Sequence, residues 1–203
     1  MGGERALRTF IAHVEDIPGV LNRVTSLFRR RAYNIASLTV GQTHRPGISR
    51  ITLVMEADDD EARRIEANLY KLVNVLFVEE VTNAKAVARE LMLVKVRADA
   101  TTRPQVMQVC DVFRARVIDV GPEGLIAEIT GAGDKIDGLV EVLRPFGIIE
   151  MVRTGTVAMV RSAESAGHER EAALASLEAR VAERAAELEA ALREAEGEEE
   201  RAA

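Results

Sequence analysis

The chain has a single cysteine, Cys110, among its 203 residues, which excludes an internal disulfide framework and any zinc site built on cysteine thiolates. Its three histidines (His13, His44 and His168) are too far apart in the sequence to suggest a metal triad. No Ser-His-Asp or Cys-His arrangement, phosphate-binding loop or dinucleotide fingerprint is present. The residues therefore offer no catalytic group, metal ligand or cofactor site of the chain's own.

Long apolar runs are also missing, because charged residues interrupt each hydrophobic stretch before it reaches the length of a membrane-spanning helix. The first residues, Met-Gly-Gly-Glu-Arg, lack the apolar core of a secretory signal. We therefore expect no membrane segment and a cytoplasmic location.

Net charge is absent from most of the chain. Residues 1–164 hold 22 basic and 22 acidic residues, whereas residues 165–203 hold eleven Glu and five Arg and carry the whole net charge of -6. A neutral body with an acidic tail argues against nucleic acid as a partner.

What is present is a regular alternation of strand and helix patterns. In the first 80 residues, strands are expected at 9–14, 35–42, 49–56 and 75–81, and helices at 20–30 and after an acidic cap at 58–61. The second half repeats this order, with strands at 91–97, 116–120, 125–130 and 148–160, and with helices that start near Pro104 and at an Asp134 cap. Two consecutive βαββαβ units predict an α+β fold of two ferredoxin-like domains.

These patterns divide the chain into a first domain (1–82), a second domain (83–161) and a tail (162–203), with a linker near residues 82–89. The tail is rich in Ala, Glu and Arg and has no proline, which favours a helix, and its end after Gly197 is expected to be disordered. Leucine and valine occupy heptad-like positions in it, but too few to establish a coiled coil. A solvated helix and a docking or oligomerisation helix both remain open; the positions are Leu174, Leu177, Val181 and Leu188.

The strands of the first domain are apolar on both faces, as Ile11 and Val14 or Leu53 and Val54 show. Helices cover only one face of such a sheet, and an exposed apolar face is larger than a monomer usually tolerates. We therefore expect the sheets to pair across a homodimer.

The turn between the first strand and the first helix is the strongest candidate site. One interpretation is a turn in which Asp16, Pro18 and Gly19 serve backbone geometry alone. The alternative is a ligand site, because the backbone N–H groups of Gly19, Val20 and Leu21 at a helix N-terminus suit a small carboxylate.

A helix end contributes only ~0.3–1 kcal/mol, up to ~2, whereas a millimolar ligand needs about 4 kcal/mol. Asp16 (for an ammonium group) and Asn34 (for a carboxylate or an ammonium group) are expected to supply more. The candidate apolar wall that selects the ligand's side chain consists of Ile17, Ile35 and Leu38.

Several stretches together resemble one family. Residues 14–43 resemble the ACT domain of the small, regulatory subunit of acetolactate synthase (acetohydroxyacid synthase). The likeness continues through residues 69–78, 89–96, 113–120 and 144–155, so that it covers about residues 7–161 and both domains.

The resemblance implies a non-catalytic subunit that activates a large catalytic subunit and confers feedback inhibition by a branched-chain amino acid, usually valine. Thiamine diphosphate, Mg and FAD are then expected on that catalytic partner. The effector of such proteins lies where two ACT domains meet. By that likeness one protomer contributes Asp16, Gly19, Val20 and Leu21, and the other contributes Asn34 and Ile35, with Ile17 as the wall candidate beside them. A free-standing amino-acid sensor with another partner is the alternative.

Overall fold

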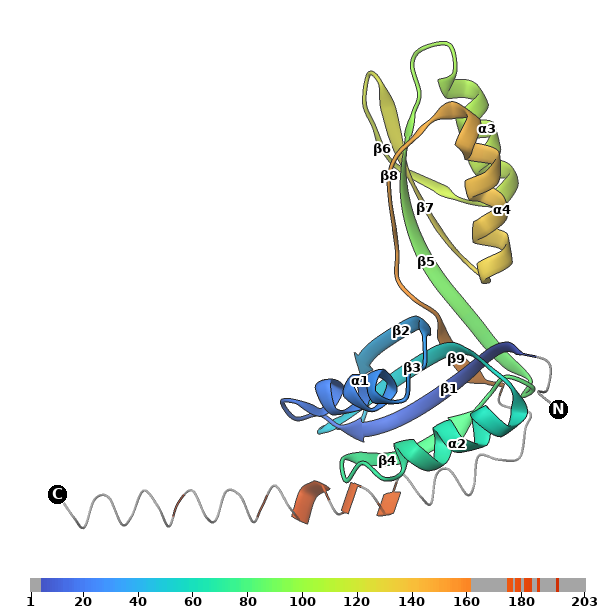
Figure 1. The fold of residues 1–203 in the computed structure, drawn as a ribbon. Helices are drawn as coiled ribbons and strands as arrows, with labels where there is room; N and C mark the ends of the chain where they lie inside the picture. The colour runs from blue at the N-terminus through green and yellow to red at the C-terminus, as the bar shows by residue number, and fades with distance from the viewer. Residues whose placement is uncertain are drawn as a thin grey trace.

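The computed structural model describes residues 5–161 and nine residues of the tail, which are 175–176, 178–179, 181–183, 186 and 193. The first unit contains β1 (Ala6–Glu15), α1 (Val20–Arg30), β2 (Ile35–Gln42), β3 (Ile48–Ala57), α2 (Asp59–Leu69) and β4 (Val75–Glu80). Its sheet has the order β2-β3-β1-β4, and all its pairs are antiparallel, so β1 and β2 run in the same direction. The predicted βαββαβ unit is confirmed (Figure 1).

The second unit contains β5 (Ala86–Arg97), α3 (Arg103–Phe113), β6 (Arg116–Val120), β7 (Gly124–Gly131), α4 (Gly133–Leu143), a 3₁₀ turn (Arg144–Phe146), β8 (Ile148–Arg153) and β9 (Val157–Val160). Its strands follow the order β6-β7-β5-β8, and β9 pairs with the first part of β5. The two-domain α+β fold is therefore confirmed.

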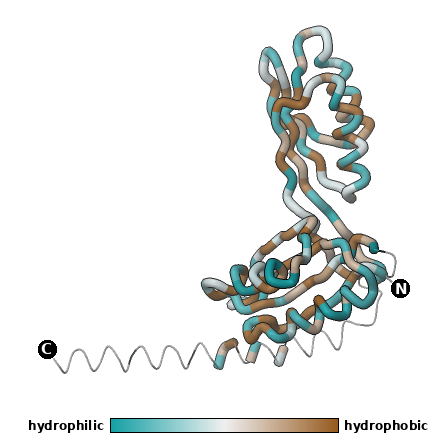
Figure 2. The backbone as a smooth tube through the Cα atoms, in the orientation of Figure 1, coloured by the Kyte–Doolittle hydropathy of each residue, from teal (hydrophilic) through white to brown (hydrophobic). Residues whose placement is uncertain are grey.

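Each unit has one core between its helices and one sheet face (Figure 2). In α1 the apolar residues Val20, Val24, Leu27 and Phe28 recur every three to four positions, and all four are buried against the sheet. In α2 the predicted acidic cap is a full capping box. The Asp58 carboxylate accepts from the Glu61 backbone N–H, and the Glu61 carboxylate accepts from the Asp58 backbone N–H.

The expected Asp134 cap is wrong. Ala132 is the N-cap of α4, and Asp134 lies in the first turn, where its carboxylate accepts from the Lys135 N–H. An acidic residue there still suits the helix dipole, which is the pattern that the sequence displayed.

The predicted linker and the last predicted strand both differ from the structure. Strand β5 begins at Ala86, inside the expected linker, and the expected strand over residues 148–160 is interrupted at residues 154–156. The first part of β5 and all of β9 form a two-stranded ribbon that lies on the first sheet, on the face that α1 and α2 do not cover. Ile11 of β1 and Ala158 of β9 are buried together there with Val81.

We expected a second copy of the chain to cover the whole apolar face of each sheet, and the ribbon shows that this is not needed for all of the first sheet. The chain itself covers part of that face in the first unit. The second sheet has no such cover in the described residues, and Ile149 and Val152 of β8 are 51% and 58% exposed.

Most of the predicted tail, residues 162–203, lies outside the described residues. Its nine described residues are helical. Glu178 forms an ion pair with Arg45 at 3.2 Å, and Val181 lies against Gly47 in the turn between β2 and β3. None of the helices described here is long and apolar enough to cross a bilayer.

Candidate functional site

The N-terminus of α1 begins at a glycine and has no side-chain cap. Gly19 is the N-cap with φ of +87°, in the left-handed region that L side chains rarely adopt. The first turn of α1 contains no acidic residue, and the Val20 N–H reaches the Ile17 carbonyl only at 3.5 Å. A Cβ at Gly19 would meet nothing within 4 Å. The positive end of this helix therefore faces open space, as a carboxylate site requires.

Asp16 is held at this helix end by the neighbouring hairpin. Its backbone N–H donates to the Gly47 carbonyl at 2.9 Å, and its Oδ2 accepts from Gln42 Nε2 at 3.2 Å. The Asp16 carboxylate thus lies beside the last residue of β2, on the exposed side of the turn. This places a negative group next to the helix end, where a ligand ammonium could pair with it.

The apolar residues of the turn divide into two classes. Val20 is buried in the core, whereas Ile17 is 48% exposed and Leu21 is 42% exposed. Ile17 is therefore exposed beside the turn, and its role as a wall for a ligand side chain stays a prediction. Leu38, the other wall candidate in β2, packs partly into the core of the first unit.

Asn34 and Ile35 lie at the opposite end of the same sheet. Ile35 pairs with Met55, which pairs with Arg8, whereas Asp16 follows the last paired residue of β1. Eight residues separate Arg8 from Asp16, which is about 26 Å along a strand. One chain therefore does not bring Asn34 and Ile35 to Asp16 and Gly19.

In the second unit a carboxylate binds the backbone of the turn just before α3, which the sequence reasoning missed, although α3 itself has no side-chain cap. Asp99 follows β5 and accepts from the backbone N–H groups of Thr101 and Thr102, both at 2.9 Å, and from their two hydroxyls at 2.7 and 3.0 Å. These bonds, led by the Thr101 hydroxyl, lower the pKa of Asp99 to about 2. The Asp-x-Thr-Thr sequence before Pro104 is the signal that could have revealed it.

Other residues that stand out in the sequence have structural explanations. Cys110 lies in the core of the second unit, where burial raises the pKa of its thiol. His13 is buried with its ring 6.0 Å from that of Phe77. Arg29 and Arg30 lie in the last turn of α1, where cations suit the helix dipole. Within the described residues, no three His, Cys, Asp or Glu side chains are grouped to hold a metal ion.

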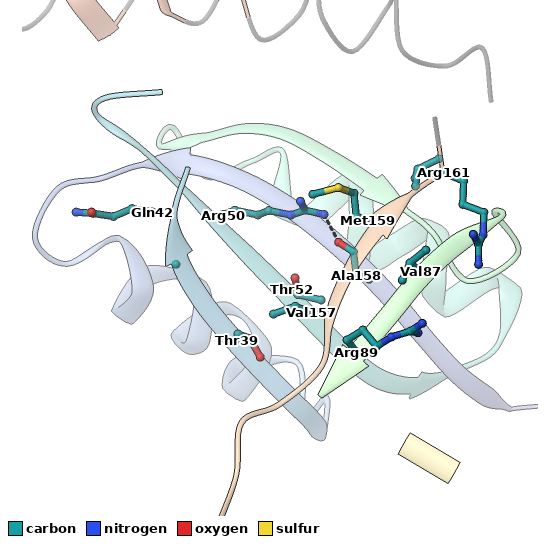
Figure 3. Close-up of a pocket in the computed structure, with 12 residues that line it drawn as sticks. Thr39, Gln42, Arg50, Thr52, Val87, Arg89, Val157, Ala158, Met159 and Arg161 are labelled. Carbon is teal, nitrogen blue, oxygen red and sulfur yellow. Dashed lines mark hydrogen bonds between the residues drawn. The ribbon is translucent and has the colours of Figure 1, made fainter. Parts of the chain in front are cut away.

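A groove of about 760 Å³ lies between the ribbon and strands β2 and β3 (Figure 3). It is lined by Thr39 and Arg50 from the sheet and by Val157 and Met159 from β9. None of the predicted effector residues lines it. The groove borders the α1 N-terminus only through Gln42, which lines it and donates to Asp16.

Comparisons with known proteins agree with the fold and with the resemblance. Residues 10–77 match the model of the AHAS small subunit-like ACT domain, and residues 89–162 match the model of the small subunit of acetolactate synthase. The acetolactate synthase small subunit of Mycolicibacterium smegmatis is 46% identical over 154 residues, which are 76% of this chain and 91% of that relative. The corresponding protein of Mycobacterium leprae is 47% identical over the same shares of the two chains.

The crystal structure of the acetolactate synthase small subunit from Thermotoga maritima superposes with a TM-score of 0.72 at 38% identity. The match covers 77% of this chain and 98% of the Thermotoga chain. Both units take part in these matches, and the tail falls outside them. The chain therefore belongs to the family of acetolactate synthase small subunits.

Proposed function

We propose that this chain is the non-catalytic, regulatory subunit of an acetolactate synthase, which activates a catalytic large subunit and makes it sensitive to valine. The catalytic subunit would condense two pyruvates and would carry thiamine diphosphate, Mg and FAD. The observation that carries the effector part is the open N-terminus of α1, with Gly19 in the left-handed region and no side-chain cap.

A two-chain effector site agrees with the topology of the first sheet. Strand β2 is at the edge of the sheet, with β3 as its only partner among the described strands. An antiparallel, two-fold pairing of β2 with β2 of a second copy, centred on Leu38 and Thr39, would place Ile35 of the second copy opposite Gln42. Because Gln42 donates to Asp16, Asn34 of the second copy would lie at the α1 N-terminus. The separation of about 26 Å between Asp16 and the level of Ile35 within one chain supports a site in which Asn34 and Ile35 come from a second copy.

Regulation then consists of two linked equilibria. Binding of this subunit stabilises the active arrangement of the catalytic subunit, and valine bound between two ACT domains shifts that arrangement away from activity. Couplings of this kind typically amount to ~1–3 kcal/mol, or about 5–150-fold in affinity. Valine must bind the inhibited state better than the active state, since equal affinity for the two would shift nothing.

The test is acetolactate formation from pyruvate by the cognate catalytic subunit, alone and with this chain, with and without millimolar valine. Activation that valine reverses is the expected result. Absence of both activation and a complex would contradict the proposal and favour a free-standing sensor.

Light scattering at micromolar concentration tests the dimer separately. The expected mass is twice the 22.2 kDa of one chain. A monomer would contradict the shared effector site, because one chain keeps its two halves apart.

A further inference from the structure

The two units are joined by a second connection besides the chain that leads into β5. After β8 the chain returns to the first unit through residues 154–156, here called the crossing segment, and continues as β9. Thr154 still belongs to the second unit, since its N–H donates to the Leu91 carbonyl at 3.0 Å. Two residues later, the Thr156 N–H donates to Ser37 Oγ of β2 at 2.9 Å. The crossing segment therefore passes from one sheet to the other within three residues.

Gly155 lets the crossing segment approach β2 very closely. A Cβ at this position would lie 2.5 Å from Ser37 Oγ and 2.6 Å from Thr39 Oγ1, closer than real Cβ contacts. Gly155 has no positive φ, so the close approach, rather than backbone conformation, is what requires glycine here. Any shift of β2 relative to β3 would thus press on the crossing segment or release it.

The crossing segment is also bonded to a charged cluster of the second unit. Thr156 Oγ1 donates to Glu90 Oε1 of β5 at 2.8 Å, and Arg153 Nη2 and Nε donate to Glu90 Oε2 at 2.6 and 3.0 Å. Arg153 Nη1 continues to Asp137 of α4 at 2.6 Å. The Glu90 and Arg153 side chains are only 15% and 30% exposed, so solvent screens this pair less than a surface pair. Hydrogen bonds therefore run without a gap from Ser37 in β2 to α4.

A pocket of about 650 Å³ lies beside this chain of contacts, between β2 and the start of α4. Its lining includes Leu38 from the first unit and Gly133 and Asp134 from the second. On this flank the two units meet across open volume rather than through a packed interface. The second unit has room to tilt about the crossing segment.

We propose that the crossing segment is the joint that couples β2 to the second unit, with Gly155, Thr156 and Ser37 as positioning residues. Strand β2 begins directly after Asn34 and is the edge that a second copy would pair with. The regulatory part of this inference rests on the proposed function, because valine bound at that edge would move β2 and, through the joint, α4. Packed elements with a few discrete arrangements can carry such coupling, but only measured coupling establishes it.

The first experiment needs no effector and uses the full chain alone. Amide hydrogen exchange is compared among the wild type, Ser37→Ala, Thr156→Val, Thr156→Ser and the control Thr154→Val, whose hydroxyl contacts Leu91 and the Gly155 carbonyl but not β2. Ser37→Ala removes the acceptor of the Thr156 N–H, whereas Thr156→Val keeps that N–H and loses the bond to Glu90. We expect Ser37→Ala and Thr156→Val each to speed exchange at least threefold both in β2 and in α4, and Thr156→Ser to keep wild-type rates. Faster exchange confined to residues 154–160 would overturn the joint.

The second experiment adds the catalytic subunit and uses Gly155→Ala. Its added methyl should push β2 and the crossing segment apart while Asp16, Gly19 and Asn34 stay in place. We expect activation to persist and the calorimetric valine dissociation constant to change less than threefold, while inhibition at saturating valine falls to less than half. Full inhibition, or a loss of inhibition that merely follows a loss of valine binding, would overturn the role in regulation.

The two inferences fail in different ways. If wild-type protein neither binds valine nor activates the catalytic subunit, the proposed function fails, whereas the exchange experiment still decides whether β2 and α4 are coupled. If valine inhibits the wild type and the exchange in α4 does not respond to Thr156→Val, the joint fails and the proposed function stands.

Discussion

The two units share one fold, and neither α1 nor α3 has a side-chain cap, but the turns that precede these helices differ. At α3, Asp99 supplies a carboxylate that accepts four hydrogen bonds from Thr101 and Thr102. At α1, the equivalent place has Gly19, no side-chain cap and no acidic residue in the first turn. In the second unit the carboxylate of the strand-to-helix turn is bonded to the backbone of that turn, whereas in the first unit the Asp16 carboxylate accepts from Gln42 instead. The difference leaves the start of α1 without a side-chain carboxylate bound to its backbone, which is the feature on which the proposed effector site rests.

The sheet faces away from the helices differ as well. In the first unit, β9 and the start of β5 cover part of that face, and Arg50 of β3 donates to the Ala158 carbonyl of β9 (Figure 3). In the second unit the corresponding face carries exposed Ile149 and Val152. The first unit is therefore tied to the second through its sheet face, and β2 is at the edge of its sheet with β3 as its one strand neighbour among the described residues.

The largest expected effect comes from giving the first unit a carboxylate of its own, with Gly19→Asp. A Cβ at Gly19 has open space, so the new carboxylate can occupy the ligand's place. The left-handed backbone adds a strain of roughly 1–2 kcal/mol for a residue other than glycine. We expect the valine concentration for half-maximal inhibition to rise at least 100-fold, so that millimolar valine no longer inhibits, while activation of the catalytic subunit is kept.

The matched control is Gly19→Asn, which has the same shape and tolerates the left-handed region but carries no charge. It should weaken valine far less than Gly19→Asp in the same acetolactate assay. Equal loss of valine inhibition in the two variants would mean that strain, rather than charge, acts at this position. Equal loss of activation and inhibition would contradict separate sites.

The next effect tests whether the far end of β2 belongs to the same site. Asn34→Ala removes a polar contact to the ligand, which typically contributes about 1–3 kcal/mol, or roughly 5–150-fold in valine affinity. Asn83→Ala, an exposed asparagine in the connection before β5, is the control. Calorimetry with valine measures both variants. Unchanged affinity in Asn34→Ala would refute the role assigned to Asn34.

A smaller effect is expected from removing the carboxylate that the second unit supplies. Asp99→Ala leaves the N–H groups of Thr101 and Thr102 without this acceptor, so the melting temperature should fall by a few degrees. Asp111→Ala, an exposed aspartate on α3, should leave it nearly unchanged. The melting temperature is measured by calorimetry. An unchanged melting temperature in Asp99→Ala would show that water replaces the carboxylate without loss of stability.

The stability difference between the wild type and Asp99→Ala should depend on pH, because folding lowers the pKa of Asp99. Its pKa is lowered from 3.8 to about 2 in the folded chain, so the folded state favours the ionised carboxylate. The stabilisation is therefore fully present above about pH 4 and is lost as the pH falls from 4 toward 2. Wild type and Asp99→Ala should converge in stability over this interval.

Local signals predicted α1 well. The helix begins at Val20 and ends at Arg30, as expected, because Pro18-Gly19 marks its start and four apolar residues mark its buried stripe. The start of β5 was missed, since Ala86–Arg89 has weak strand signals and is a strand only because β9 pairs with it. That pairing joins residues about 70 positions apart, which local patterns cannot register.

The same limit applies to the candidate site. The turn and its glycine were visible in the sequence, because Asp, Pro and Gly have strong local conformational preferences. That Gln42 holds Asp16, or that Gly155 lies on Ser37, depends on strand register and on how the units pack. Only a three-dimensional structure reveals contacts of that kind.

The smallest expected effect concerns the tail, which contacts the first unit through Glu178 and Val181. Glu178 is 45% exposed in its pair with Arg45, and such partly exposed pairs contribute at most about 1 kcal/mol. Glu178→Gln should therefore lower the melting temperature by less than about 4 °C. Glu183→Gln changes an exposed glutamate of the described tail and is the control for loss of one negative charge.

The same variant, Glu178→Gln, tests whether the tail affects valine binding at the start of α1. Arg45 and Gly47 lie in the turn whose Gly47 carbonyl accepts from the Asp16 N–H, so the tail contacts the turn that holds the open helix end. If Glu178→Gln leaves valine affinity within threefold of the wild type, the tail only covers this turn. A larger change in valine affinity, absent in Glu183→Gln, would show that the tail contributes to the proposed effector site of the first unit.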